Sequence, residues 1–187
     1  MHSDSLVIIP TYNERENIAQ MIDTVFALPQ AFHLLVVDDG SPDGTAAIVR
    51  EKQAEYPEAL HLLERSGKQG LGTAYIAGFH WALERDYAYI IEMDCDFSHP
   101  PIKLLELRAA CHERGADVAV GSRYVPGGAV KNWPLDRILM SRGASLYVRL
   151  IMGMPVMDPT AGFVCYRREV LETMELGEVH FKGYAFQ

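Results

Sequence analysis

The 187-residue sequence has no uninterrupted apolar run of the roughly 18–20 residues that a membrane-spanning helix requires. Basic residues are also scarce: 17 Lys and Arg stand against 25 Asp and Glu, and the net charge of -8 argues against a nucleic-acid-binding protein. The three cysteines form no CxxC pair, so neither a disulfide framework nor a zinc site is expected. With no pattern typical of a secretory signal at the N-terminus, we expect a cytoplasmic protein.

Short apolar runs alternate with amphipathic stretches along the chain. The apolar runs predict strands at 6–9, 34–37, 60–63, 89–93 and 118–120. The amphipathic stretches predict helices near 14–27, 43–55, 72–85 and 101–114. Several of the strands are apolar at nearly every position, as in strands that are buried on both faces of a sheet. The pattern therefore predicts an α/β fold with a mainly parallel central sheet and helices on both faces.

Two helix starts are expected from capping patterns. Asn13 followed by Glu16 matches a capping box, in which each side chain bonds to a free backbone N–H group. Ser41 offers an N-cap, and Pro42 would then occupy the first helical position.

Acidic residues stand at three of the predicted strand ends. Ligands of parallel sheets bind outside the carboxyl ends of the strands, so the chemistry is expected there. These ends carry Glu14, Asp38, Asp39, Asp94 and Asp96, whose mutual repulsion is unfavourable unless cations or hydroxyl donors bind there. Asp94 and Asp96 are two apart and project the same way from an extended segment. This arrangement suits Mg²⁺ or Mn²⁺, with water and a diphosphate as further ligands.

Two further motifs leave alternatives open. His99 precedes two prolines at a predicted helix entrance, so a turn or capping role competes with contact to a ligand. The glycine cluster at 67–74 follows the third strand rather than the first, and Tyr75 stands where a dinucleotide fingerprint has its third glycine. We reject a Rossmann NAD site, although glycines such as Gly72 allow the backbone to approach a nucleotide closely.

Seven sequence blocks, taken in order, resemble the polyprenol-phosphate mannose synthases. The blocks are IIPTYNERENI, VVDDGSPDGT, GKQGLGTAYIAGF, MDCDFSHPP, VGSRYVPGG, WPLDRILMSRGAS and DPTAGFVCYRREV. These synthases include the dolichyl-phosphate mannosyltransferases and form a branch of the inverting family 2 glycosyltransferases. The resemblance covers nearly the whole chain. It implies a GT-A fold, a GDP-mannose donor, a divalent cation and a polyprenyl phosphate acceptor.

The resemblance also implies roles for individual residues. The expected nucleotide-binding residues are Pro10, Tyr12, Glu14, Asp38, Asp39, Gly72 and Asp94. Among them, Asp38 contacts the nucleotide or only orients its own loop. Asp94 and Asp96 are expected to hold the metal and the diphosphate, with Ser98 close by. The family usually has Ala within this acidic motif, and we expect the side chain of Cys95 to pack away from the metal.

Arg123 and Arg137 are expected to bind phosphate groups, including that of the acceptor, and Arg142 is a weaker candidate. A surface ion pair is the alternative for each of them. The expected catalytic residues are Asp96, Arg123 and Arg137. A phosphate monoester with a second pKa near ~6 is already ionised at neutral pH, so no general base is needed. A single in-line displacement then implies inversion and a β-linked product.

We expect a single domain with a nucleotide-sugar-binding part at about 1–122 and an acceptor-side part at about 123–187. Residues 137–156 combine a narrow polar stripe with a wide apolar face, which is either buried or placed in a membrane interface. Peripheral attachment to the cytoplasmic face of a membrane is therefore expected. Asp158 is a candidate for catalysis or for holding arginine side chains.

Members of the family continue beyond the position of Gln187 with another phosphate-binding arginine. We therefore expect a C-terminally truncated chain that binds the nucleotide with weak or absent transfer. The alternatives are transfer of another sugar, such as glucose from UDP-glucose, and an inactive nucleotide-sugar-binding fragment. No oligomeric state is predicted.

Overall fold

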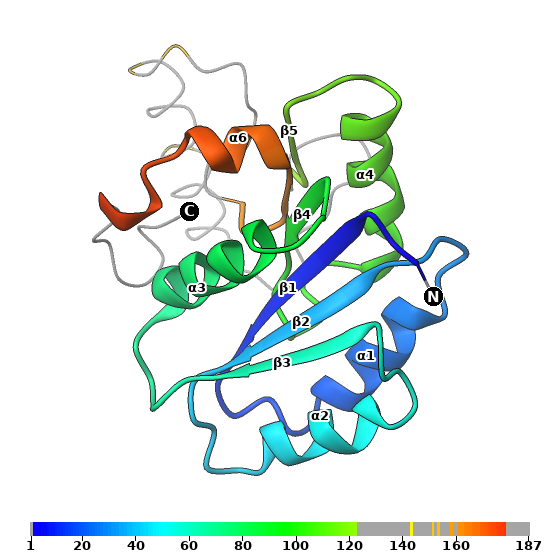
Figure 1. The fold of residues 1–187 in the computed structure, drawn as a ribbon, viewed down its shortest axis with the longest axis vertical. Coiled ribbons are helices and arrows are strands. Elements are labelled where there is room, and N and C mark those ends of the chain that lie inside the picture. Colours follow the sequence, from blue (N-terminus) through cyan, green and yellow to red (C-terminus); the bar gives the residue numbers. More distant parts are fainter. Residues whose placement is uncertain are drawn as a thin grey trace.

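The computed structural model describes residues 2–122, 143, 151, 153, 158 and 161–178. The strands are β1 (Ser5–Thr11), β2 (His33–Asp38), β3 (Leu60–Glu64), β4 (Tyr89–Glu92), β5 (Val118–Val120) and β6 (Val164–Arg167). The helices are α1 (Ile18–Phe26), α2 (Thr45–Gln53), α3 (Leu71–Leu83), α4 (Leu104–His112) and α6 (Arg168–Thr173), with short 3-10 helices η1 (Pro101–Lys103) and η2 (Leu176–Glu178). The six strands form one sheet with the order β3-β2-β1-β4-β6-β5 (Figure 1).

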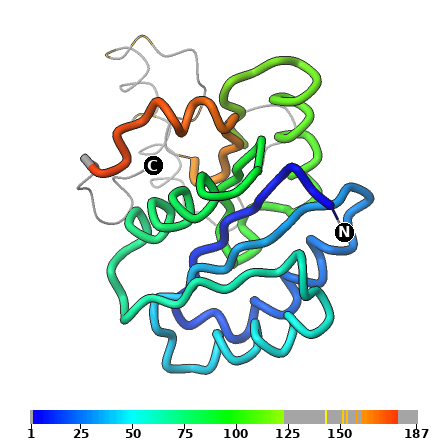
Figure 2. Tube along the Cα trace, viewed as in Figure 1, coloured from blue at the N-terminus to red at the C-terminus, as the bar shows by residue number. Residues whose placement is uncertain are grey.

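The sheet is mainly parallel, as predicted. β1 lies between β2 and β4 and is parallel to both, and β3 extends the parallel part beside β2. β6 pairs between β4 and β5 and is antiparallel to both, so it lies just inside the edge strand β5, although it follows β5 in the sequence (Figure 2). This strand was missed, because its four residues include Tyr166 and Arg167 and do not form an apolar run.

Alternate residues of the strands pack against two separate layers of helices. On one face, Val7 and Ile9 of β1 join a core cluster with residues of α1, α2 and α4. On the other, Leu6 and Ile8 pack with residues of α3 and α6. All four of these β1 side chains are fully buried, as expected for a central strand covered on both faces. The prediction of helices on both faces is thus confirmed (Figure 1).

Both predicted helix starts are wrong. α1 follows Asn17 without a side-chain cap, and the backbone N–H of Asn13 donates instead to Oγ of Ser41 at 3.0 Å. α2 starts at Thr45, whose backbone N–H and hydroxyl both donate to Oδ1 of Asp43. Asx-type bonds from nearby aspartates compete with the expected caps, so the two loops are tied to each other rather than to the helix ends.

None of the helices in the described part of the chain is both long and apolar enough to cross a membrane. Within 137–156, the expected membrane-contacting segment, the structure describes only residues 143, 151 and 153. That expectation therefore falls outside the described residues.

Candidate active site

The carboxyl ends of three neighbouring strands bring the predicted acidic residues to one edge of the sheet. β1 lies between β2 and β4, and Thr11 at its end is in register with Asp38. Glu14, Asp94 and Asp96 all lie near Cys95. Burial raises the pKa of the Cys95 thiol, and the negative charges of these three carboxylates raise it further. The strand order thus places the carboxylates of separate sequence motifs side by side.

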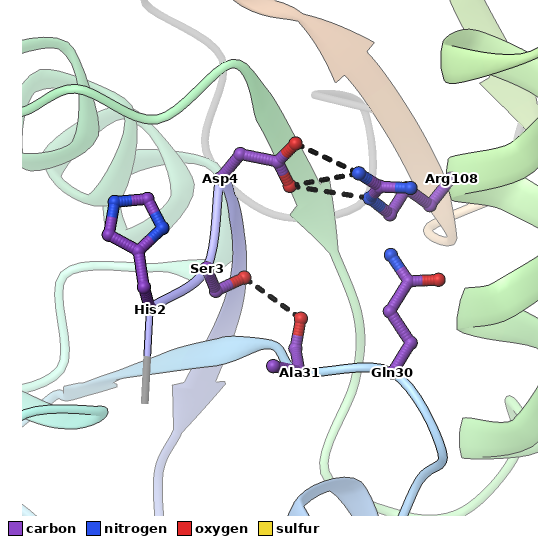
Figure 3. Close-up of a pocket in the computed structure, with 6 residues that line it drawn as sticks. All are labelled: His2, Ser3, Asp4, Gln30, Ala31 and Arg108. Carbon is purple, nitrogen blue, oxygen red and sulfur yellow. Dashed lines mark hydrogen bonds and ion pairs between the residues drawn. The ribbon is translucent and has the colours of Figure 1, made fainter.

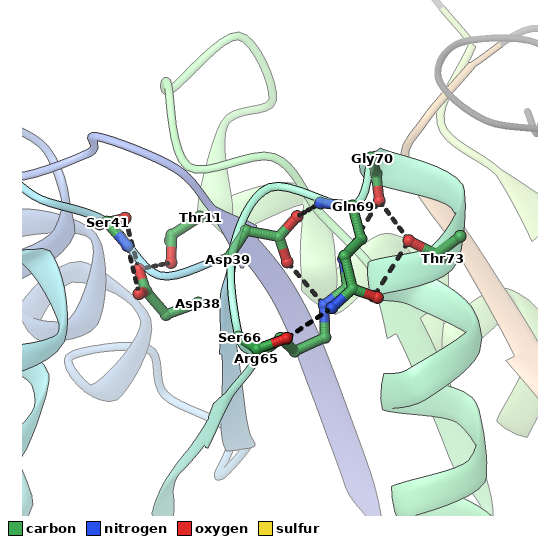
Figure 4. A network of polar contacts seen from close by, with 9 residues as sticks. All are labelled: Thr11, Asp38, Asp39, Ser41, Arg65, Ser66, Gln69, Gly70 and Thr73. Carbon is green, nitrogen blue, oxygen red and sulfur yellow. Dashed lines mark hydrogen bonds and ion pairs between the residues drawn. The ribbon is translucent and has the colours of Figure 1, made fainter.

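The side chain of Asp38 is held by hydrogen bonds from its own loop and from β1. Its side chain is buried, and Oδ1 accepts hydrogen bonds from the hydroxyls of Thr11 (2.9 Å) and Ser41 (2.6 Å). Oδ2 accepts the backbone N–H of Ser41 at 2.9 Å (Figure 4). Of the two roles considered for Asp38, the geometry favours orientation of the loop that follows β2.

Asp39 is part of a buried ion pair that sequence reasoning missed. Its Oδ1 accepts from Nε of Arg65 at 2.6 Å, and Oδ2 accepts the backbone N–H of Gln69 at 3.0 Å (Figure 4). The side chains of Arg65 and Asp39 are only 9% and 8% exposed. Arg65 also donates to Oγ1 of Thr73 on α3 at 3.0 Å. In the sequence, the one feature that points to Arg65 is its place directly after β3, at the same edge of the sheet.

The other expected nucleotide-binding residues of this edge range from exposed to buried. Tyr12 is 37% exposed, and the Nζ of Lys68 lies 4.4 Å from the centre of its ring, in cation–π geometry. Glu14 accepts a hydrogen bond from Asn17, while Pro10 lies within β1. Gly72 is buried in the first turn of α3.

The two carboxylates of the Asp-Cys-Asp motif differ in their surroundings. Asp94 is partly buried, and its Oδ1 accepts a hydrogen bond from the hydroxyl of Tyr75 at 3.2 Å. Asp96 is exposed, and its Oδ1 accepts the backbone N–H of Ser98 at 2.9 Å. Between them, Cys95 is 3% exposed and belongs to the core cluster on the α1 face. The predicted packing role of Cys95 is confirmed.

A further buried carboxyl, which the sequence did not reveal, lies directly behind this motif. Glu92 at the end of β4 is 1% exposed, and its Oε1 has no hydrogen-bond partner among the described residues. Burial, and then the negative charge of Asp94, raise the pKa of Glu92 to about 8, although a hydrogen bond with Tyr166 acts in the opposite direction. At neutral pH, therefore, Glu92 is mostly a neutral acid. In the sequence, the feature that points to a buried carboxyl is a glutamate within an otherwise apolar strand.

His99 does not cap the following helix, because Pro100 occupies the N-cap position of η1. Its ring stacks on Phe163, with centroids 5.0 Å apart and an interplanar angle of 22°. Its Nε2 lies 3.6 Å from Oδ2 of Asp94, just beyond hydrogen-bonding distance. The structure thus places His99 beside the acidic pair, and its contact with a ligand stays a prediction.

Asp94 and Asp96 suit a cation that takes its remaining ligands from elsewhere. Within the described ranges, no group of three or more His, Cys, Asp or Glu side chains forms a complete metal cage. Mg²⁺ commonly binds through one or two carboxylates together with waters and substrate phosphates, and Mn²⁺ accepts the same oxygen ligands. The donor set of this edge therefore fits a cation that arrives with a diphosphate.

The predicted phosphate-binding arginines Arg123, Arg137 and Arg142 lie outside the described residues. The described range 2–122 ends just before Arg123. Near its end, the backbone N–H of Gly121 donates to the carbonyl of Phe163 at 2.7 Å. A side chain at Gly121 would lie 2.5 Å from the Phe163 ring, so the two backbones meet closely here. Asp158 is fully buried.

A hollow lies at the opposite, amino-terminal end of β1. Its lining residues are His2, Ser3, Asp4, Gln30, Ala31 and Arg108 (Figure 3). The guanidinium of Arg108 is already paired with Asp4 at 2.8 Å and bonded to Ser5 at 2.9 Å. This hollow is an ion-paired junction between α4 and the N-terminal segment, away from the acidic edge.

Comparison with known proteins agrees with this geometry. The profile of glycosyl transferase family 2 matches residues 6–174. The chain belongs to glycosyl transferase family 2. The predicted membership of this family is therefore confirmed, and with it the prediction of a transferase.

Two curated relatives align with nearly the whole chain. The polyprenol monophosphomannose synthase of Mycolicibacterium smegmatis is 52% identical over 98% of this chain and 69% of that protein. The undecaprenyl-phosphate mannosyltransferase of Micrococcus luteus is 46% identical over 97% of this chain and 74% of that protein. The resemblance to polyprenol-phosphate mannose synthases is thus confirmed.

A solved structure supports the fold. A mannosyltransferase from Pyrobaculum calidifontis, in complex with GDP-Man and Mn²⁺, superposes with a TM-score of 0.62 at 20% identity. The match covers 92% of this chain and 46% of that one. The predicted α/β fold of the GT-A type is confirmed.

Proposed function

We propose that this chain transfers mannose from GDP-mannose to a polyprenyl phosphate with inversion, forming polyprenyl-phosphate β-mannose. The observation that carries the proposal is the acidic pair Asp94 and Asp96, placed beside the β1 and β2 loops in a chain 52% identical to a polyprenol monophosphomannose synthase. A cation and a nucleoside diphosphate are the ligands that such an edge accommodates.

In this proposal Asp94 and Asp96 hold Mg²⁺ or Mn²⁺, with Ser98 beside them. The ion, when bound, supplies positive charge to the leaving diphosphate. Asp96 is exposed and bonded to a single backbone N–H group, so its second oxygen is free to turn toward the ion. Its position makes it the side chain most directly involved in stabilising the leaving group.

The nucleoside part of the donor lies along the ends of β1 and β2. Tyr12 presents an exposed ring and Pro10, Glu14 and Gly72 shape the surrounding backbone. Asp39 contributes from within its ion pair with Arg65, which fixes the orientation of that carboxylate. Asp38 acts indirectly, through the loop that it orders.

The acceptor is a phosphate monoester, and Arg123 and Arg137 are proposed to bind it. One of its oxygens attacks the anomeric carbon of mannose, forming a new C–O bond. The bond from that carbon to the diphosphate breaks, and GDP leaves with the electron pair. The attacking oxygen carries no proton at neutral pH, so no side chain has to act as a base.

We further propose a nucleotide-sugar-binding part at about 1–122 and an acceptor-side part at about 123–187. Peripheral contact with a membrane, through residues 137–156, would deliver the lipid phosphate to the arginines. A lipid substrate requires a surface of this kind.

Donor competition tests the choice of sugar nucleotide. We expect calorimetry in Mn²⁺ buffer to give tighter binding of GDP-mannose than of UDP-glucose. Mass spectrometry should then detect polyprenyl-phosphate mannose after incubation with polyprenyl phosphate in detergent. Tighter binding of UDP-glucose would contradict the assignment of mannose, and a glucosylated lipid would replace it.

A further inference from the structure

Tyr75 is the largest fully buried side chain in the described part of the chain. It lies in α3, directly after the glycine segment, and its ring packs beside that of Phe79 with centroids 6.4 Å apart. A buried phenol normally finds a partner for its hydroxyl, and this one donates to Oδ1 of Asp94 at 3.2 Å. The core on the α3 face thus reaches the proposed metal ligand from behind.

This contact makes the acidic pair asymmetric. Asp94 is held through one oxygen by a side chain with no exposed surface, and its other oxygen, Oδ2, faces His99. Asp96, by contrast, is exposed and contacts only its own turn through Ser98. One carboxylate of the pair is therefore oriented before any ligand arrives, whereas the other can still adjust.

We infer that Tyr75 is a positioning residue for the metal site, which fixes Asp94 so that Oδ2 is the oxygen presented to the cation. Hydrogen bonds to ligating carboxylates orient them and are a general feature of metal sites. The inference rests on the metal assignment in the proposed function. It adds a residue that does not contact the metal or the nucleotide.

The same turn of α3 is tied to the nucleoside side of the edge. Thr73, two residues before Tyr75, accepts a hydrogen bond from Arg65, which is paired with Asp39. The start of α3 therefore connects the carboxylate after β2 with the carboxylate after β4. Because helix backbone is stiff, this connection sets the spacing between the two halves of the donor site.

Replacing Tyr75 by Phe keeps the buried ring and removes only the hydroxyl. We expect Tyr75→Phe to weaken Mn²⁺ binding in the presence of GDP by about 10- to 100-fold, as is typical for loss of a hydrogen bond to a metal ligand. Free Mn²⁺ is measured by electron paramagnetic resonance. Tyr87→Phe is the matched control, because its hydroxyl bonds to His33 at the other end of the sheet.

A second pair of variants tests the contact from the side of Asp94. Asp94→Asn keeps an oxygen for the Tyr75 hydroxyl, whereas Asp94→Ala leaves that buried hydroxyl without this partner. We expect both to lose Mn²⁺ binding, but only Asp94→Ala to lower the melting temperature in EDTA.

Unchanged Mn²⁺ affinity in Tyr75→Phe, with Mn²⁺ binding intact in the wild type, overturns the inference. Equal melting temperatures of Asp94→Asn and Asp94→Ala overturn it as well, and this comparison holds even if Tyr75→Phe does not fold. A wild-type chain that binds no Mn²⁺ with GDP contradicts the metal assignment of the proposed function instead.

Discussion

Replacement of Glu92 by Gln should stabilise the protein, and increasingly so as the pH rises. Glu92 is buried at the end of β4, and burial together with the charge of Asp94 raises its pKa from 4.5 to about 8. The folded chain therefore retains a proton that the unfolded chain releases above pH 4.5. Glutamine has the same shape as the neutral acid and cannot ionise.

The sign and size of the effect follow from proton linkage. Below pH 4.5 both the folded and the unfolded state carry the proton, so Glu92 adds no pH dependence to the free energy of unfolding there. Between 4.5 and about 8 the unfolded state binds fewer protons, and the free energy of unfolding of the wild type falls as the pH rises. At about 1.36 kcal/mol per pH unit, the loss is about 3 kcal/mol at pH 7 and at most about 5 kcal/mol above pH 8.

Urea denaturation at several pH values between 5 and 8.5, in EDTA, measures this difference. Glu92→Gln and wild type should nearly coincide at pH 5 and diverge steadily toward pH 8.5. Glu113→Gln, at an exposed position after α4, is the matched control and should show no such divergence. A Glu92→Gln effect that is independent of pH, or that grows as the pH falls, would refute the assignment of a neutral buried acid.

Two other changes test the packing and the opposite end of the sheet. Gly78→Ala would place a methyl group 2.6 Å from Cγ2 of Ile8, so we expect urea denaturation to show a free energy of unfolding lower by about 1–3 kcal/mol. Gly177→Ala, with open space around it, is the control and should change the free energy of unfolding little. Burial, together with the charges of His33 and Arg85, lowers the pKa of His61, so the stability contributed by its neutral form should be lost as the pH falls below 6.5. His61→Phe should reduce this fall in melting temperature between pH 6.5 and 5; an unchanged slope would contradict the burial argument.

The sequence predicted the parallel part of the sheet because each of its strands is a compact apolar run. It could not predict β6, which is short and polar in half of its residues and is held in the sheet by its neighbours. The helix starts failed for a related reason. Asp43 and Ser41 accept hydrogen bonds from the backbone N–H groups of Arg15 and Asn13 in the loop after β1, and these tertiary bonds outweigh the local capping preferences.

The acidic edge was predictable because parallel strands bring their carboxyl ends together. The residues that support it were not, since their roles depend on contacts between distant segments. Arg65 became visible only through its ion pair with Asp39, and Tyr75 only through its bond to Asp94. The predicted roles of Arg123 and Arg137 remain predictions, because both lie outside the described residues.

The most direct test of the acidic pair is calorimetric titration of GDP-mannose into the wild type and Asp96→Ala, each with Mn²⁺ and with EDTA. Asp86→Ala, at an exposed position after α3, is the control. We predict that Mn²⁺ tightens binding to the wild type and to Asp86→Ala but not to Asp96→Ala, because the lost carboxylate is a ligand of the ion. Binding that is equally tight in EDTA, and unchanged in Asp96→Ala, would contradict a metal held by Asp94 and Asp96.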